Sequence, residues 1–170
     1  MEKFYIAEEG SKLRKDYLEH LESAKKVRKL AIQLFETHGI TAKEYYANNN
    51  YIHIVPTEED KEKFSNQLCK PKDGLYRFRA NSKINRAWVR TLEANEVQVI
   101  SRPMVPLYFG IYWGGRMQSR LFEIDGVVYC SFNADGEFKP KDKLTEIKAS
   151  EFFKVIEDYN ERIKENENAI

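Results

Sequence analysis

The sequence predicts an α+β fold: a single domain with a mainly antiparallel sheet and a C-terminal β meander, packed by a long N-terminal helix and a C-terminal helix. Three observations favour this class. Apolar residues recur every three or four positions over 11–38 and again from Phe152 onward, which is typical of amphipathic helices. Alternating apolar runs separated by turn residues follow Leu107. The predicted strands follow one another as antiparallel neighbours, whereas a parallel sheet would alternate strands with helices.

The composition is that of one compact domain, which we place at 1–164, with a frayed polar tail at 165–170. The 170 residues are 42% hydrophobic, enough for a core that folds without disulfides or metals. The net charge of +1 argues against a general nucleic-acid coat protein but allows a local basic patch. The N-terminus carries no secretory signal, and no apolar run approaches the ~20 residues of a membrane span. We therefore expect a cytoplasmic protein with no membrane contact, whose two cysteines are free thiols.

The first elements follow directly from local patterns. A short strand at 3–7 precedes the long helix at 11–38, which Gly39 closes as the residue after the C-cap. Two short strands then flank an Asn-rich turn at 48–50, because Asn tolerates left-handed backbone angles. Thr57 begins a short polar helix with acids in its first turn, where the helix dipole favours them.

The remaining elements are read in the same way. Segment 75–80 is a short strand or an ordered loop, after which Asn81 or Ser82 caps a helix to about Ala94. We expect a strand at 96–102. The meander follows, with strands at 107–113, 116–124 and 127–132 that turn at Gly114-Gly115 and at Asp125-Gly126. A last helix, capped by Ser150, presents an apolar stripe of Phe152, Ile156, Tyr159 and Ile163.

A basic stretch from Lys70 to Arg90 is the strongest local anomaly, with seven Lys or Arg and a single acid. On an extended segment Arg77 and Arg79 would project to one side, and the helix start behind Ser82 would add donors for an anion. Tyr76 and Phe78 could stack on a base. The alternative is that these aromatics point inward and the arginines neutralise acid-rich helices. The predicted anion-binding set is Arg77, Arg79, Ser82, Lys83, Tyr76 and Arg86.

Aromatic residues of the meander form a second candidate surface. Trp, Tyr and Arg are favoured where proteins bind partners. Four such residues lie close together in this segment, and core packing is the alternative use for them: Tyr108, Tyr112, Trp113 and Arg116.

No coherent catalytic set is present in the sequence. Cys69 precedes two lysines that could lower its pKa, but Leu75 stands where a phosphatase-type loop needs Arg. His53 is the one histidine on a predicted strand, and Val55 stands where a two-histidine phosphoesterase carries Thr or Ser. The histidines lack metal-ligand spacing, and the glycines form no phosphate-binding loop. We therefore expect no catalytic residue, no metal and no cofactor.

Two stretches resemble a family of uncharacterised small proteins from phages and prophages of enteric bacteria: "IVPTEEDKEKFSNQLCKP" and "GLYRFRANSKINRAWV". The N-terminal strand and long helix fit this family as well. The resemblance implies a phage-derived accessory protein that acts in the bacterial cytoplasm. It carries over no functional residues.

Three hypotheses follow for the function. The first is a non-enzymatic binding protein that recognises a host or defence component or a small anionic ligand. The second is a nucleic-acid-binding protein that uses the basic segment at 70–90. The third is a small enzyme directed at a nucleotide or phosphoester, with His53 or Cys69 in its site. The long helix could also pair two copies in a homodimer.

Overall fold

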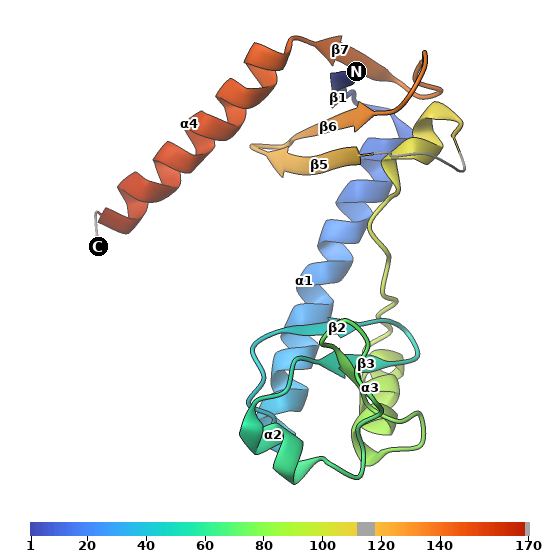
Figure 1. Cartoon of the computed structure of the whole chain (residues 1–170), viewed down its shortest axis with the longest axis vertical. Coiled ribbons are helices and arrows are strands. Elements are labelled where there is room, and N and C mark those ends of the chain that lie inside the picture. The colour runs from blue at the N-terminus through green and yellow to red at the C-terminus, as the bar shows by residue number, and fades with distance from the viewer. Residues whose placement is uncertain (112–117, 169–170) are drawn as a thin grey trace. The chain divides into compact units, whose positions relative to one another are not determined.

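The computed structural model describes residues 1–111 and 118–168, and it confirms the α+β class (Figure 1). The chain folds into two compact units, each with its own antiparallel sheet, whereas the sequence predicts one sheet. Unit 1 comprises Met1–Leu18 and Arg102–Ile170, and unit 2 comprises Glu19–Ser101. The helix α1, Lys12–His38, contributes residues to both units. No helix in the described part of the chain is long and apolar enough to cross a membrane.

Unit 1 is built on a four-stranded sheet in the order β5-β6-β1-β7, with every neighbouring pair antiparallel. The strands are β1 (Glu2–Ala7), β5 (Gln118–Ile124), β6 (Val127–Asn133) and β7 (Leu144–Ile147). The hairpin between β5 and β6 turns at Asp125 and Gly126, whose φ angles are 52° and 84°. Positive φ at both central residues is the geometry of a type I′ turn, so the hairpin predicted from the Asp-Gly pair is confirmed.

An aromatic cluster joins the last helix, α4 (Ala149–Asn168), to the sheet of unit 1. Phe152 is completely buried, with its ring centroid 4.6 Å from that of Phe4 and 5.2 Å from that of Phe122. The helix begins at Ala149, so Ser150 lies inside it and not at its cap. The helix continues to Asn168 and so includes residues 165–168 of the tail that the sequence predicts to be frayed.

Two predicted strands are wrong, the first for a local reason and the second because distant side chains satisfy its backbone. Residues 105–109 form the 3-10 helix η1, because Pro106 fits a first helical turn and Gly110 ends it at φ 73°. The rest of the strand expected at 107–113 and the turn at Gly114-Gly115 extend into residues outside the described range. In the segment 96–102, Glu96 belongs to a turn with φ 52°, and the residues after it pair with no strand in the described chain. Side chains satisfy its backbone hydrogen-bonding groups instead. The Asn49 amide accepts from Val99 N and donates to Val99 O, and the Ser23 hydroxyl accepts from Ile100 N and donates to Gln98 O.

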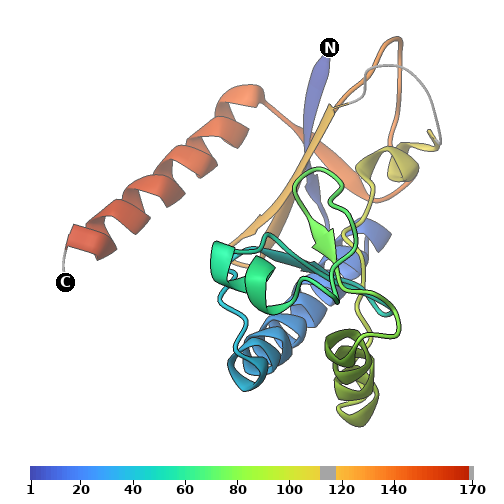
Figure 2. The same ribbon diagram turned by 60° about the horizontal axis from the view of Figure 1, so that its bottom comes forward.

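Unit 2 combines a three-stranded sheet with two short helices and the second half of α1 (Figures 1 and 2). The sheet order is β2 (Tyr45–Ala47), β3 (Ile52–Ile54) and β4 (Tyr76–Arg77), and the helices are α2 (Glu58–Lys63) and α3 (Lys83–Ala94). Its core contains the fully buried side chains of Ile52, Ile54, Phe78 and Trp88, packed with apolar residues of α1.

The predicted helix caps of unit 2 are confirmed. The Thr57 hydroxyl accepts from Asp60 N, and the Asp60 carboxylate accepts in turn from Thr57 N, which completes a capping box. The same buried carboxylate accepts from the backbone N and the hydroxyl of Thr41, at 2.8 Å and 3.0 Å. Burial alone would raise the pKa of Asp60, but the donors from Thr41 and Thr57 outweigh it and lower that pKa. Ser82 caps α3 by accepting from Asn85 N.

The turn between β2 and β3 is held by side chains of α3. The buried amide of Asn85 accepts from Ile52 N at 3.1 Å and donates to Asn50 O at 2.8 Å. The Trp88 indole donates to Asn48 O at 2.9 Å. Because α3 satisfies these backbone groups away from water, it fixes where β3 begins relative to the core.

We expect Asn85→Leu to lower the free energy of unfolding by roughly 1–3 kcal/mol, because it leaves the buried Ile52 N–H and the partly buried Asn50 C=O without their partner. Urea denaturation of the two proteins measures this difference. Asn81→Ala serves as the control, since Asn81 is exposed and should change stability by less than about 0.5 kcal/mol. An Asn85→Leu protein as stable as the wild type would show that the bridge is unimportant.

Candidate anion-binding pocket in unit 2

The basic segment divides into an inward and an outward face. Phe78 is completely buried in the core and Tyr76 is half-buried against it. Arg77 and Arg79 are exposed. The burial of Phe78 supports the first part of the alternative, that the aromatics point inward, and it rules out base stacking by Phe78 because this ring faces no solvent. The second part, that the arginines neutralise acid-rich helices, has no ion pair to support it in the described structure. Neither arginine forms an ion pair with an acid among the described residues.

Of the six predicted anion-binding residues, only Arg77 lines the pocket described below. The Ser82 hydroxyl is buried and committed to the cap of α3. Lys83 and Arg86 are exposed on that helix. Arg77 lines a pocket that includes none of the other five predicted residues. This pocket, about 380 Å³ in volume, is the candidate functional site, and we call it the basic pocket. Its lining residues are Tyr46, His53, Cys69, Lys70, Lys72, Asp73, Leu75 and Arg77.

Strand register builds one wall of the basic pocket. Tyr46 lies directly opposite His53 in the β2-β3 pair, and His53 lies directly opposite Arg77 in the β3-β4 pair. Residues opposite one another in antiparallel strands point to the same face of the sheet. The three side chains therefore form a row across the sheet, and the rings of Tyr46 and His53 meet edge to face with centroids 5.6 Å apart.

A tight turn supplies the opposite wall. Cys69 N donates to Arg77 O at 2.8 Å, which places the thiol beside β4. Lys72 and Leu75 then exchange backbone hydrogen bonds of 3.0 Å and 3.1 Å around Asp73 and Gly74. Both turn residues have positive φ, 54° and 80°, which Asp tolerates and Gly adopts without cost. The turn returns the chain to β4 and brings Lys70 and Lys72 to the pocket.

Arg77 is oriented by contacts that leave its charge uncompensated. Its guanidinium carbon lies 4.5 Å from the centroid of the Tyr51 ring, a cation–π contact. Its Nη2 donates to the Cys69 Sγ at 3.8 Å. Within the described chain, Lys70, Lys72 and Arg77 form no ion pair, and Asp73 is the one acid that lines the pocket beside them. The pocket therefore presents more positive than negative charge.

His53 adds a neutral imidazole to this site. Burial and the nearby positive charge of Arg77 lower its pKa, and the backbone of Tyr46 opposes that shift. Its Nδ1 is buried without a hydrogen-bond partner in the described structure. The described residues contain no group of three or more His, Cys, Asp or Glu able to hold a metal.

Cys69 and His53 are 16 residues apart in the sequence and share no motif, but the structure places both in the basic pocket. The strand register brings the two residues together, and no local sequence motif predicts that register. Among the described residues no hydrogen bond links the thiol to the imidazole, so a formed nucleophile–base pair is not seen. Cys130 differs from Cys69, because it is fully buried, and burial together with the charge of Asp142 raises the pKa of its thiol to about 12.

Of the four residues predicted to form an aromatic surface in the meander, the structure describes only Tyr108. Tyr108 is half-buried, and its hydroxyl donates to the Asp16 carboxylate at 2.6 Å. Burial and this carboxylate raise the pKa of Tyr108. The other three predicted residues, Tyr112, Trp113 and Arg116, lie outside the described range.

No protein-family model, curated protein or solved structure matches this chain. The function of the basic pocket is therefore argued from its own residues.

We expect the His53 pKa, followed by NMR titration of its ring protons, to lie below that of an ordinary histidine and to rise in Arg77→Gln. Removing the guanidinium removes the repulsion that disfavours the imidazolium, whereas burial remains and keeps the pKa below about 6.5. The His53 signal is identified by its absence in His53→Gln. Arg79→Gln, which removes an exposed charge that does not line the pocket, should leave the titration unchanged. An unshifted His53 in Arg77→Gln would contradict the geometry described for the row.

Proposed function

We propose that unit 2 is a binding module for a small anionic ligand, whose phosphate or carboxylate group is held by Lys70, Lys72 and Arg77. The observation that supports this function is the gathering of three cations without carboxylate partners around one pocket. Arg77 is suited to such a group because a guanidinium presents its donors in a planar fork that matches a carboxylate or a phosphate.

The size and lining of the basic pocket favour a small ligand. Its volume of about 380 Å³ lies near the lower end of the ~300–1,000 Å³ that small-molecule sites occupy. Leu75 and the ring of Tyr46 supply apolar contact beside the cations. A phosphate or carboxylate attached to a flat or apolar group therefore matches the pocket better than an extended polymer does.

The nucleic-acid, enzymatic and phage-accessory hypotheses differ in how much support the pocket gives them. A nucleic-acid site would need exposed rings for stacking, and the burial of Phe78 removes one of them. Thiol chemistry on the bound anion is the second candidate function, because Cys69 and His53 line the same pocket. The phage-associated accessory role, with a host or defence component as partner, stays a prediction that rests on the sequence resemblance.

Cys69 provides a probe of the pocket that needs no knowledge of the natural ligand. Two reagents are compared: the anionic aromatic disulfide 5,5′-dithiobis(2-nitrobenzoate) and the neutral 4,4′-dithiodipyridine. We expect the ratio of the anionic to the neutral reaction rate to be higher for Cys69 than for an isolated thiol. Arg77→Gln should lower this rate ratio by about fivefold, since a unit charge at about 4 Å contributes roughly 1 kcal/mol even in water. The ratio cancels any change in the nucleophilicity of Cys69 itself. Stopped-flow absorbance measures both rates.

Two variants make the comparison specific. Cys69→Ser should abolish the fast reaction of the folded protein, because Cys130 is fully buried. Arg79→Gln should keep most of the rate ratio, because Arg79 does not line the pocket. A wild-type ratio equal to that of a free thiol, or a ratio insensitive to Arg77, would refute the proposed anion site.

A further inference from the structure

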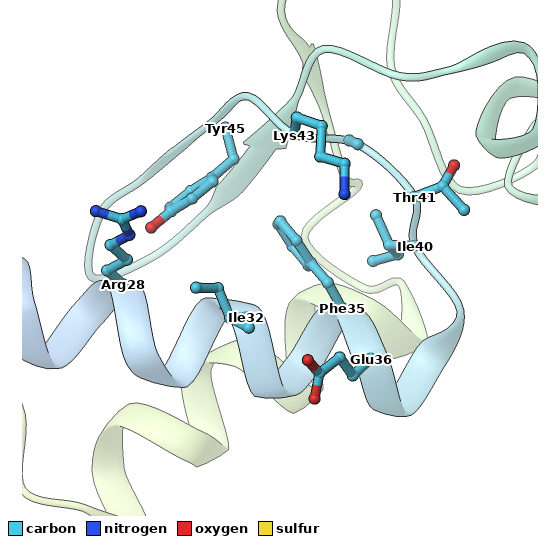
Figure 3. Close-up of a pocket in the computed structure, with 9 residues that line it drawn as sticks. Arg28, Ile32, Phe35, Glu36, Ile40, Thr41, Lys43 and Tyr45 are labelled. Carbon is cyan, nitrogen blue, oxygen red and sulfur yellow. The ribbon is translucent and has the colours of Figure 1, made fainter. Parts of the chain in front are cut away.

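A second hollow of unit 2 lies between α1 and the segment that follows this helix. Figure 3 shows Arg28, Ile32 and Phe35 of α1 together with Lys43 and Tyr45 of the segment that follows the helix. The hollow has a volume of about 570 Å³. A neighbouring hollow shares Arg28 and Ile32 with it and extends along α1 to Lys25. We call the two together the α1 groove.

The α1 groove combines an apolar floor with a positive rim. Phe35 and Tyr45 meet edge to face with ring centroids 5.4 Å apart, and Ile32 is 43% exposed between the two hollows. The rim carries four cations, and none of them forms an ion pair within the described structure: Lys25, Arg28, Lys29 and Lys43. Glu36 is the one acid along it. An occupant with apolar side chains and a net negative charge would satisfy both features.

Such an element exists in unit 1 of the same chain. Figure 1 shows that α4 runs out past the sheet of its own unit, and every residue from Glu157 to Asn168 is exposed. Tyr159 and Ile163, one turn apart on that helix, are 40% and 37% exposed. The helix carries six acids against three basic residues. Arg162 ties this half to its own unit through an exposed ion pair with Asp125 at 2.9 Å and lies over the Tyr159 ring at 5.6 Å. The half, which we call the free half of α4, is therefore an amphipathic, acidic helix whose apolar residues Tyr159 and Ile163 stay partly exposed to solvent.

We propose that the free half of α4 from one copy of the chain docks into the α1 groove of a second copy, with Tyr159 and Ile163 on the floor beside Ile32. An amphipathic helix in an apolar groove uses anchors spaced by three or four residues, as these two are. The acids of α4 face the cations of the rim, so the charges are complementary. Reciprocal exchange of α4 satisfies both surfaces of both copies and closes the assembly as a two-fold dimer.

Sedimentation velocity tests this dimer. The wild type should sediment as a dimer, and added salt should weaken it because the rim charges are exposed. Ile32→Glu and Ile163→Glu should each raise the dissociation constant by about tenfold or more, because each places a carboxylate on the apolar contact. Leu107→Glu is the matched control, since Leu107 is 41% exposed but belongs to neither surface. Circular dichroism verifies that every variant is folded.

An equal mixture of the two disrupted proteins separates this proposal from other modes of association. The Ile32→Glu chain keeps an intact α4, and the Ile163→Glu chain keeps an intact groove. At a protein concentration where each variant alone is monomeric, the mixture should therefore form a heterodimer through its one unmodified interface. A dimer that pairs α1 with α1, or α4 with α4, would not be restored by mixing. A wild type that stays monomeric, as it would if α4 covered the groove of its own chain, or a mixture that stays monomeric, would overturn the proposal.

Discussion

The buried amide of Asn85 is the contact on which the rest of unit 2 depends. It accepts a hydrogen bond from Ile52 N, at the start of β3, and donates one to Asn50 O, just before that strand. These two bonds fix β3 against α3. The register of β3 then sets which side chains share a face, because a shift by one residue would turn His53 away from Tyr46 and Arg77. The basic pocket is thus a consequence of a polar contact that lies in the core and not in the pocket itself.

The charged side chains of unit 2 fall into two groups, a buried acid that stabilises the fold and cations that line an open pocket. The buried carboxylate of Asp60 is fully used by donors from Thr41 and Thr57, which ties α2 to the end of α1 and leaves nothing for a ligand. The cations of the basic pocket have no such partners in the described chain, and Arg77 is oriented by a ring and a thiol instead. A satisfied buried acid holds a fold together, whereas oriented cations without partners in an open pocket are available to an anion.

Local chemistry was readable from the sequence, and long-range pairing was not. Gly39, Thr57, Ser82 and the Asp125-Gly126 turn act where the sequence predicts, because caps and tight turns depend on a few neighbouring residues. The meeting of His53, Cys69 and Arg77 depends on register across three strands, so no spacing along the chain reveals it. The strand predicted at 96–102 failed for a related reason: distant side chains, those of Ser23 and Asn49, satisfy its backbone.

The most direct test of the central claim is to locate a bound anion on the wild-type protein. Titration with inorganic pyrophosphate, followed by backbone amide and His ring NMR, shows where the charge is held. We expect saturable shifts centred on residues 69–77 and His53, and much smaller shifts at the start of α3, at Ser82 and Lys83. Shifts that centre on the α3 start, or a protein that shows no saturable response at low salt, would contradict it.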